Sequence, residues 1–99
     1  MESLCGFEPD QREAIFGGLR LGDADALLIA ADLEFNGVMT SLDISANYIS
    51  DEGAKALASA LRVNGVLKSI DLRFNDLGDE GKGAIRDAVS GRVGFELEM

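Results

Sequence analysis

Hydrophobic residues follow two different periods within one short segment of the chain. Apolar side chains stand at positions 39, 42, 44 and 49, and positions 42 and 44 alternate with polar neighbours, as on one face of a strand. The run 51–63 instead places alanine and leucine at helical spacing behind two acidic residues, which favour a helix N-terminus. The pattern therefore predicts a short strand around residues 42–44 and then a helix, which Asn64-Gly65 ends.

The same pattern recurs after 28 residues. Residues 36–63 and 64–91 share 11 identities at this single offset, and the apolar positions 67, 70, 72 and 77 repeat the first set. A regular repeat of this length is typical of solenoids, in which each unit buries its apolar face against its neighbours. Each unit is predicted to be a strand, a turn, a helix and a second turn.

The spacing L-x-x-L-x-L-x-x-N-x-L is matched at residues 39–49 and again at 67–77. In this the chain resembles the leucine-rich repeat proteins, specifically the ribonuclease-inhibitor-like class with 28-residue repeats. The resemblance covers roughly residues 23–99, and the run 77–99 is similar to the terminal repeat of leucine-rich proteins from algae and other protists. It implies an α/β fold, a short right-handed solenoid with parallel strands on the concave face and helices on the convex face.

Asn47 and Asn75 follow the two predicted strands. A carboxamide supplies both a donor and an acceptor, so it can satisfy backbone groups that the turn leaves unpaired. We therefore expect both asparagines to be structural.

The two ends of the chain are irregular, and the whole is expected to form one domain. Residues 1–22 are predicted to be an N-terminal capping segment with a short helix between Pro9 and Gly17-Gly18, because the strand pattern is weak there. Residues 23–99 hold the repeats and a closing strand, "FELEM", at 95–99. This interpretation allows at most three strands and leaves an open edge at the closing one.

Eighteen acidic and nine basic residues give a net charge of −9, which disfavours nucleic acid and favours a protein partner with a basic or polar surface. No apolar run approaches the ~18 residues of a membrane span, so no direct membrane insertion is expected. Cys5 is the only cysteine, which excludes an intrachain disulfide and favours a reducing compartment. We expect the cytoplasm, or an organelle such as the chloroplast if a transit peptide has been removed.

Catalysis is not expected. The chain has no histidine, the commonest general base. Asp76 and Gly83 stand where a phosphate-binding loop of the Walker type requires glycine and serine or threonine. Arg73 stands where a calcium loop that began at Asp71 would need an oxygen ligand. We expect no enzyme activity, no cofactor and no metal.

Residues between the buried leucines are expected to point out of the concave face. The candidate partner-binding residues there are Asp43, Ser45, Asp71, Arg73, Phe74, Glu96 and Glu98. Arginine and aromatic residues are enriched at interface hot spots, which singles out Arg73 and Phe74. Two alternatives stay open: the acidic column is a solvated surface that only discourages edge pairing, and Phe74 packs under the turn toward the core.

These features predict a non-catalytic protein–protein interaction module that binds its partner through the concave face or the open end. The alternative function is a small structural subunit of a larger multiprotein assembly. It is suggested by the small number of complete repeats, because solenoid units stabilise one another.

Overall fold

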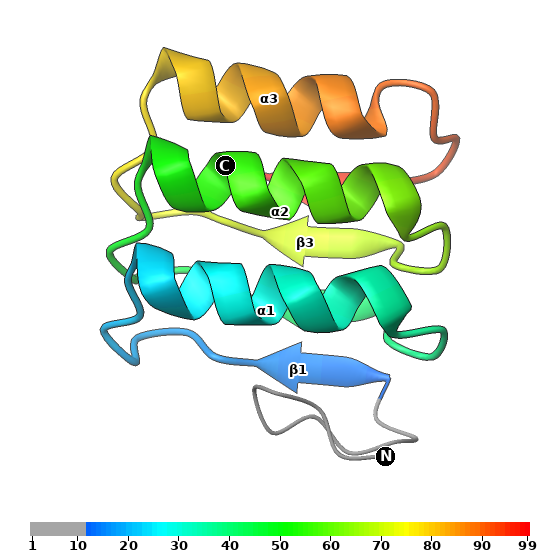
Figure 1. Cartoon of the computed structure of the whole chain (residues 1–99), viewed down its shortest axis with the longest axis horizontal. Coiled ribbons are helices and arrows are strands. Elements are labelled where there is room, and N and C mark those ends of the chain that lie inside the picture. The colour runs from blue at the N-terminus through cyan, green and yellow to red at the C-terminus, as the bar shows by residue number, and fades with distance from the viewer. Residues whose placement is uncertain (1–11) are drawn as a thin grey trace.

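The computed structural model describes residues 12–99, which form a parallel four-stranded sheet covered on one face by three helices (Figure 1). Strands and helices alternate in the order β1 (Glu13–Ile15), α1 (Asp23–Phe35), β2 (Ser41–Asp43), α2 (Asp51–Val63), β3 (Ser69–Asp71), α3 (Asp79–Val89) and β4 (Glu96–Glu98). Neighbouring elements of one kind lie side by side in chain order, so each strand–helix unit stacks on the one before it. The predicted solenoid is confirmed.

The strand register shows how regular the repeat is. Ala14 pairs with Leu42 and Leu42 with Ile70, each 28 positions apart, whereas Ile70 pairs with Leu97 at an offset of 27. The closing repeat is thus one residue shorter. The chain passes through a left-handed glycine, Gly94, with φ of +77°, two residues before β4.

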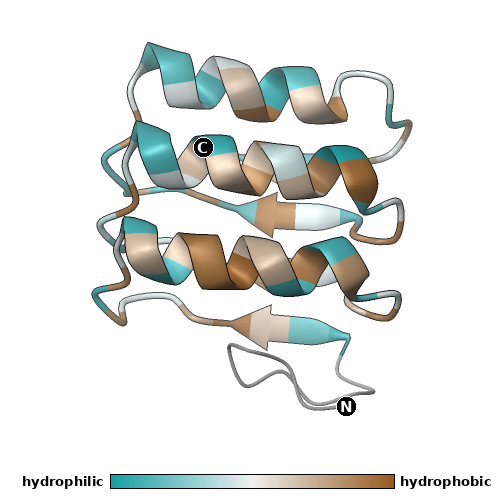
Figure 2. Ribbon diagram, viewed as in Figure 1, coloured by the Kyte–Doolittle hydropathy of each residue, from teal (hydrophilic) through white to brown (hydrophobic). Residues whose placement is uncertain are grey.

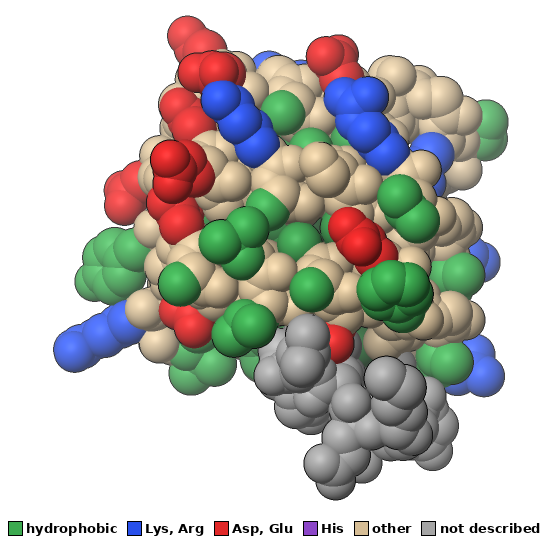
Figure 3. Space-filling view, viewed as in Figure 1, with side chains coloured by type: hydrophobic (Ala, Val, Ile, Leu, Met, Phe, Trp, Pro, Cys, Tyr) green, Lys and Arg blue, Asp and Glu red, His purple; other side chains and the backbone are tan. Residues whose placement is uncertain are grey.

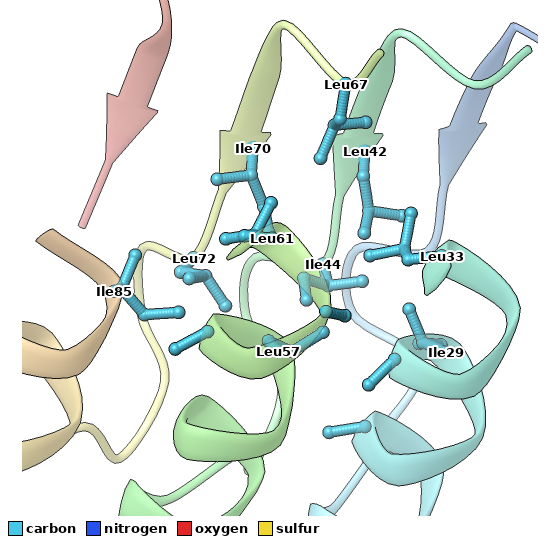
Figure 4. Packing of buried hydrophobic residues seen from close by; sticks show 14 of the residues in the cluster. Ile29, Leu33, Leu42, Ile44, Leu57, Leu61, Leu67, Ile70, Leu72 and Ile85 are labelled. Carbon is cyan, nitrogen blue, oxygen red and sulfur yellow. The ribbon is translucent and has the colours of Figure 1, made fainter. Parts of the chain in front are cut away.

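The core lies between the sheet and the helices. Side chains from the strands and from the inner faces of the helices point toward one another (Figure 4). The largest fully buried side chains are Leu33, Met39, Leu42, Ile44, Ile49, Leu57, Leu61, Leu67, Ile70, Leu72 and Ile85. The period-2 positions predicted for the strands and the helical positions predicted for α2 therefore form a single core.

The N-terminal segment contains a strand where the sequence predicted a capping helix. Glu13–Ile15 pairs with β2, and Ala14 is fully buried at the position that Leu42 occupies in the next unit. An alanine is a weak strand signal, but parallel pairing with β2 satisfies the backbone here and decides the conformation. The limit of three strands is therefore wrong. The predicted helix start, Pro9, lies outside the described residues.

Asn47 and Asn75 each connect their own turn to the preceding repeat through side-chain hydrogen bonds. The Asn47 Oδ1 accepts hydrogen bonds from the Leu19 and Leu21 backbone N–H groups, at 3.1 and 2.9 Å. Its Nδ2 donates to the Phe16, Ile44 and Ser45 carbonyls, each at 3.0 Å. Asn75 likewise accepts from the Ile49 N–H and donates to the Ile44 and Leu72 carbonyls, at 2.9 to 3.1 Å.

A second set of polar side chains closes the C-terminal ends of the helices. Asn64 ends α2, as the Asn64-Gly65 pair predicted, and does so in an extended conformation with φ of −81°. Its Oδ1 accepts from the Val66 and Leu67 N–H groups, and its Nδ2 donates to the Leu33 and Asn36 carbonyls. In the closing repeat Arg92 takes this position and donates to the carbonyls of Leu61, Asn64 and Leu67.

The first aspartates of α1 and α2 each bind the N-terminus of the helix that follows. The Asp23 Oδ1 accepts from the Ser50 and Gly53 N–H groups, and the Asp51 Oδ1 accepts from those of Gly78 and Gly81. Asp51 thus has a second role besides the start of its own helix, where the sequence placed it. Within residues 12–99 no buried side-chain nitrogen or oxygen lacks a hydrogen-bond partner.

We predict that Asn47→Ala destabilises the fold by several kcal/mol, since each buried backbone group that loses its partner costs about 1 to 3 kcal/mol. Chemical denaturation followed by circular dichroism measures the free energy of unfolding. Asp76→Ala, an exposed turn residue beside Asn75, is the control and should change it by less than about 0.5 kcal/mol. A loss below that value for Asn47→Ala would contradict the structural role.

Candidate functional site

Two rows of side chains run across the four strands on the face away from the helices. Because Ala14, Leu42, Ile70 and Leu97 point toward the helices, their neighbours in each strand point the other way. One row is Glu13, Ser41, Ser69 and Glu96, and the other is Ile15, Asp43, Asp71 and Glu98. We call this surface the concave face.

The concave face holds a shallow hollow of about 210 Å³. Every charged residue that lines it is acidic: Glu13, Asp43, Asp71, Glu96 and Glu98. The structure thus brings four of the candidate residues, Asp43, Asp71, Glu96 and Glu98, around one hollow. Glu13 and Ile15 were missed because their strand was not predicted: the sequence Glu-Ala-Ile does not alternate polar and apolar residues, and only the structure shows that Ala14 is buried between two exposed neighbours.

Arg73 lies beside the hollow and is held by two of its carboxylates. Its Nε and Nη2 donate to the Asp71 Oδ1 and Oδ2, at 3.1 and 2.9 Å, and Nη2 lies 3.1 Å from the Glu98 Oε2. The hydrogen bond from Arg73 lowers the pKa of Asp71, and the pKa of Arg73 is correspondingly raised. Arg73 is thus oriented within the chain and offsets part of the negative charge.

Phe74 is exposed, and its backbone is strained. Its side chain is 79% exposed, so the alternative in which it packs under the turn is wrong. Its φ of +61° matches +55° at Ala46 and +71° at Gly18, one and two repeats earlier. The turn thus requires a left-handed residue in every unit, and a residue with a β-carbon costs about 1 kcal/mol or more there.

Ser45 and Phe74 lie at the ends of the strands, beyond the hollow that holds the carboxylates. Ser45 is half-buried, and its N–H donates to the Asp43 Oδ1 at 2.9 Å. This bond fixes the Asp43 carboxylate at the rim of the hollow. The same bond recurs one repeat later, where the Arg73 N–H donates to the Asp71 Oδ1 at 3.0 Å.

The described part of the chain offers no other obvious chemistry. Among residues 12–99, no group of three or more acidic, cysteine or histidine side chains is arranged to hold a metal ion. None of the helices in the same range is long and apolar enough to cross a membrane. Cys5, the single cysteine, lies outside the described residues.

We predict that Phe74→Gly stabilises the fold by up to about 1 kcal/mol, because glycine relieves the left-handed strain. The ring that the substitution removes is exposed, so its loss costs little packing. Thermal melting measures the effect. Ala46→Gly, the equivalent position one repeat earlier, is the matched control and should shift the melting temperature in the same direction. A marked loss of stability for Phe74→Gly alone would mean that the ring packs against the protein after all.

We also predict that Asp71→Asn reduces the acid sensitivity of the fold. Since the folded state lowers the pKa of Asp71 below 3.8, its contribution is complete above about pH 4 and is lost as the pH falls through the folded pKa. The variant should be less stable at pH 7, by less than about 1 kcal/mol for this solvent-screened pair. Its melting temperature should then approach that of the wild type as the pH falls through the lowered pKa of folded Asp71. Asp87→Asn, on the exposed side of α3, is the control, and a difference that persists in acid would contradict the assignment.

The leucine-rich repeat family model matches residues 35–58 and 63–85, which contain β2 and β3 with parts of α1, α2 and α3. Comparison with curated protein sequences finds no significant match.

A solved structure described as "Leiomodin-1 Actin-Binding Site 2 (ABS2)" shares the architecture, with a TM-score of 0.82 and 24% sequence identity. The match covers 91% of this chain but 53% of the leiomodin-1 chain, so this chain spans about half the length of that one. At this identity the likeness concerns the fold. Together with the two repeats that match the family model, it shows that the architecture of this chain is a short leucine-rich repeat solenoid.

Proposed function

We propose that this chain is a non-catalytic protein-binding module whose concave face takes a basic segment of a partner protein. The observation that carries the proposal is the hollow across all four strands, in which every charged lining residue is acidic. Such a surface attracts Lys- and Arg-rich segments and repels nucleic acid and anionic lipid. A basic or polar protein surface is therefore the partner that we propose.

The geometry suits an extended segment that crosses the strands. The serines of the first row are small, and the Ser69 Oγ donates a hydrogen bond to the Ser41 Oγ at 3.0 Å. The centre of the concave face is therefore low relative to the longer carboxylate side chains at either side. Long basic side chains can reach the carboxylates on either side of this low centre. Phe74, exposed at the end of β3, would add an apolar contact next to the Arg73 that is held in place.

The repeat length supports the ribonuclease-inhibitor-like class, since three consecutive strands keep a 28-residue register. The leiomodin-1 structure of the same fold is described as an actin-binding site, which supports a protein as the partner of a surface of this kind. With a single cysteine in the chain, we propose a reducing compartment such as the cytoplasm.

A structural subunit of a larger assembly is the second candidate. It is favoured by several large apolar side chains that the described structure leaves exposed, among them Leu27, Phe35 and Val93. A subunit that needs its assembly should aggregate or melt at low temperature when isolated. A module should elute as a stable species with a cooperative thermal transition, so size-exclusion chromatography and a thermal melt separate the two.

The binding proposal is tested with immobilised protein and an extract of the source cells, with captured proteins identified by mass spectrometry. The dissociation constant of the captured partner is then measured for Asp43→Asn with Glu96→Gln. We expect binding to weaken about five- to tenfold and its salt dependence to decrease, because exposed charges steer and hold a basic partner.

The matched control is Glu52→Gln with Asp87→Asn, which removes the same two charges from the helical face. It should change the dissociation constant less than about twofold if the charges act locally. Equal weakening by both double variants would show that only the net charge matters. Binding that neither salt nor the concave substitutions affect would refute the concave site.

A further inference from the structure

The outer face of α1 is apolar, unlike that of the other two helices. Leu27 is 57%, Leu28 45% and Phe35 87% exposed. Figure 2 shows α1 as the most hydrophobic of the three helices, and Figure 3 shows hydrophobic side chains gathered over it, while the Lys and Arg side chains that lie over the helices are found in the upper part of the view, over α2 and α3. Large apolar side chains that gather on an exposed surface often mark an interaction site.

The repeat itself shows that the fold does not require these side chains. The positions of Leu27, Leu28 and Phe35 are taken by Lys55, Ala56 and Val63 in α2 and by Gly83, Ala84 and Gly91 one repeat later. Lys55 forms an exposed ion pair with Glu80 at 2.5 Å, as expected for a surface that faces water. The other two units thus carry smaller or charged residues at these positions and still stack, so the bulk on α1 serves something other than stacking.

A hollow of about 220 Å³ lies next to this surface. It is lined by Phe16, Leu19, Leu21, Leu28 and Ile29, with Asp25 as the one charged residue. Leu28 belongs to both the exposed surface and the hollow, so the two are continuous. Apolar anchors that fill such pockets provide much of the energy of protein interfaces.

The charge around this surface selects its partner. Helix α1 carries Asp23, Asp25, Asp32 and Glu34 and no basic residue. Two copies of the chain, each with a net charge of −9, would bring these acidic helices together and repel one another. An apolar surface bordered by carboxylates is instead complementary to an apolar stripe bordered by lysine or arginine.

We propose that Leu27, Leu28, Phe35 and the adjoining hollow form a second binding surface, the α1 face, which takes an amphipathic helix of a partner protein with basic residues along its apolar stripe. Recognition follows the helix-in-groove mode, with apolar anchors at helical spacing. The α1 face lies on the helical side of the sheet, opposite the carboxylates of the concave face. The chain can therefore bind two partners at once and connect them.

The test uses the 99-residue chain and two synthetic 18-residue helical peptides, each with a leucine stripe at i, i+3, i+4 and i+7. One peptide has lysine at its polar positions and the other has glutamate. Fluorescence anisotropy measures the dissociation constants for the wild type and for Leu27→Gln with Phe35→Gln. The control is Tyr48→Gln with Val93→Gln, which replaces two equally exposed apolar residues elsewhere.

We expect the lysine peptide to bind and the α1 variant to weaken its binding about tenfold or more, because both removed side chains are proposed anchors. The control variant should change it less than about twofold, and the glutamate peptide should bind more weakly than the lysine peptide. The concave variant Asp43→Asn with Glu96→Gln should weaken the lysine peptide less than the α1 variant does, which assigns the contact with the leucine stripe to the α1 face and separates this test from that of the concave site.

Four results would overturn the proposal. Equal affinity for all variants would mean non-specific attraction to an acidic protein, and equal affinity for both peptides would remove the role of charge. A melting temperature that falls by more than a few degrees in the α1 variant would show that the chain itself covers this surface. Self-association in analytical ultracentrifugation that depends on Leu27 and Phe35 would make a second copy the occupant.

Discussion

Hydrogen bonds from side chains to the backbone of the adjacent repeat hold this fold together. Each strand has three residues, too few for a sheet to be stable through its ladder alone. Asn47 and Asn75 connect each turn to the unit before it, whereas Asp23 and Asp51 connect each helix to the unit after it. Adjacent units therefore complete each other's polar groups in both directions, and the apolar core between sheet and helices can form without unpaired backbone at the turns.

Much of this architecture could be predicted from the sequence, because two consecutive units carry the same pattern. Leu42, Ile44, Ile70 and Leu72 alternate clearly, and the asparagines after them follow from the needs of the turn. The first strand could not be predicted in this way, because Ala14 contributes little apolar surface and its place is decided by pairing with β2. The local pattern of apolar and polar residues is a weak guide to secondary structure wherever a neighbouring element supplies the hydrogen bonds of the backbone.

The site was predictable in part for a related reason. Strand alternation places Asp43, Asp71, Glu96 and Glu98 on one face, and the structure brings them around one hollow. That Arg73 would be tied to Asp71 and Glu98, and that Phe74 would stand exposed, depends on the left-handed turn. The turn could have been suspected from Gly18, the residue that precedes Phe74 by two repeats. The apolar outer face of α1 could also have been found by aligning it with α2 at the 28-residue offset.

The glycine at the third position of α2 and α3 limits where a duplicated repeat can be inserted. A β-carbon at Gly53 or Gly81 would lie 2.6 or 2.5 Å from the aspartate carboxylate of the preceding helix, so only glycine admits that carboxylate. In α1 the equivalent residue is Asp25, which accepts a hydrogen bond from the Gly22 N–H of its own helix at 2.9 Å. A copy of residues 36–63 is therefore compatible with a place between two existing units. A copy of α1 in that place would bring the copied Asp25 carboxylate against the aspartate carboxylate of the preceding helix. Gene duplication can therefore lengthen this solenoid from its interior units but not by repeating its first helix.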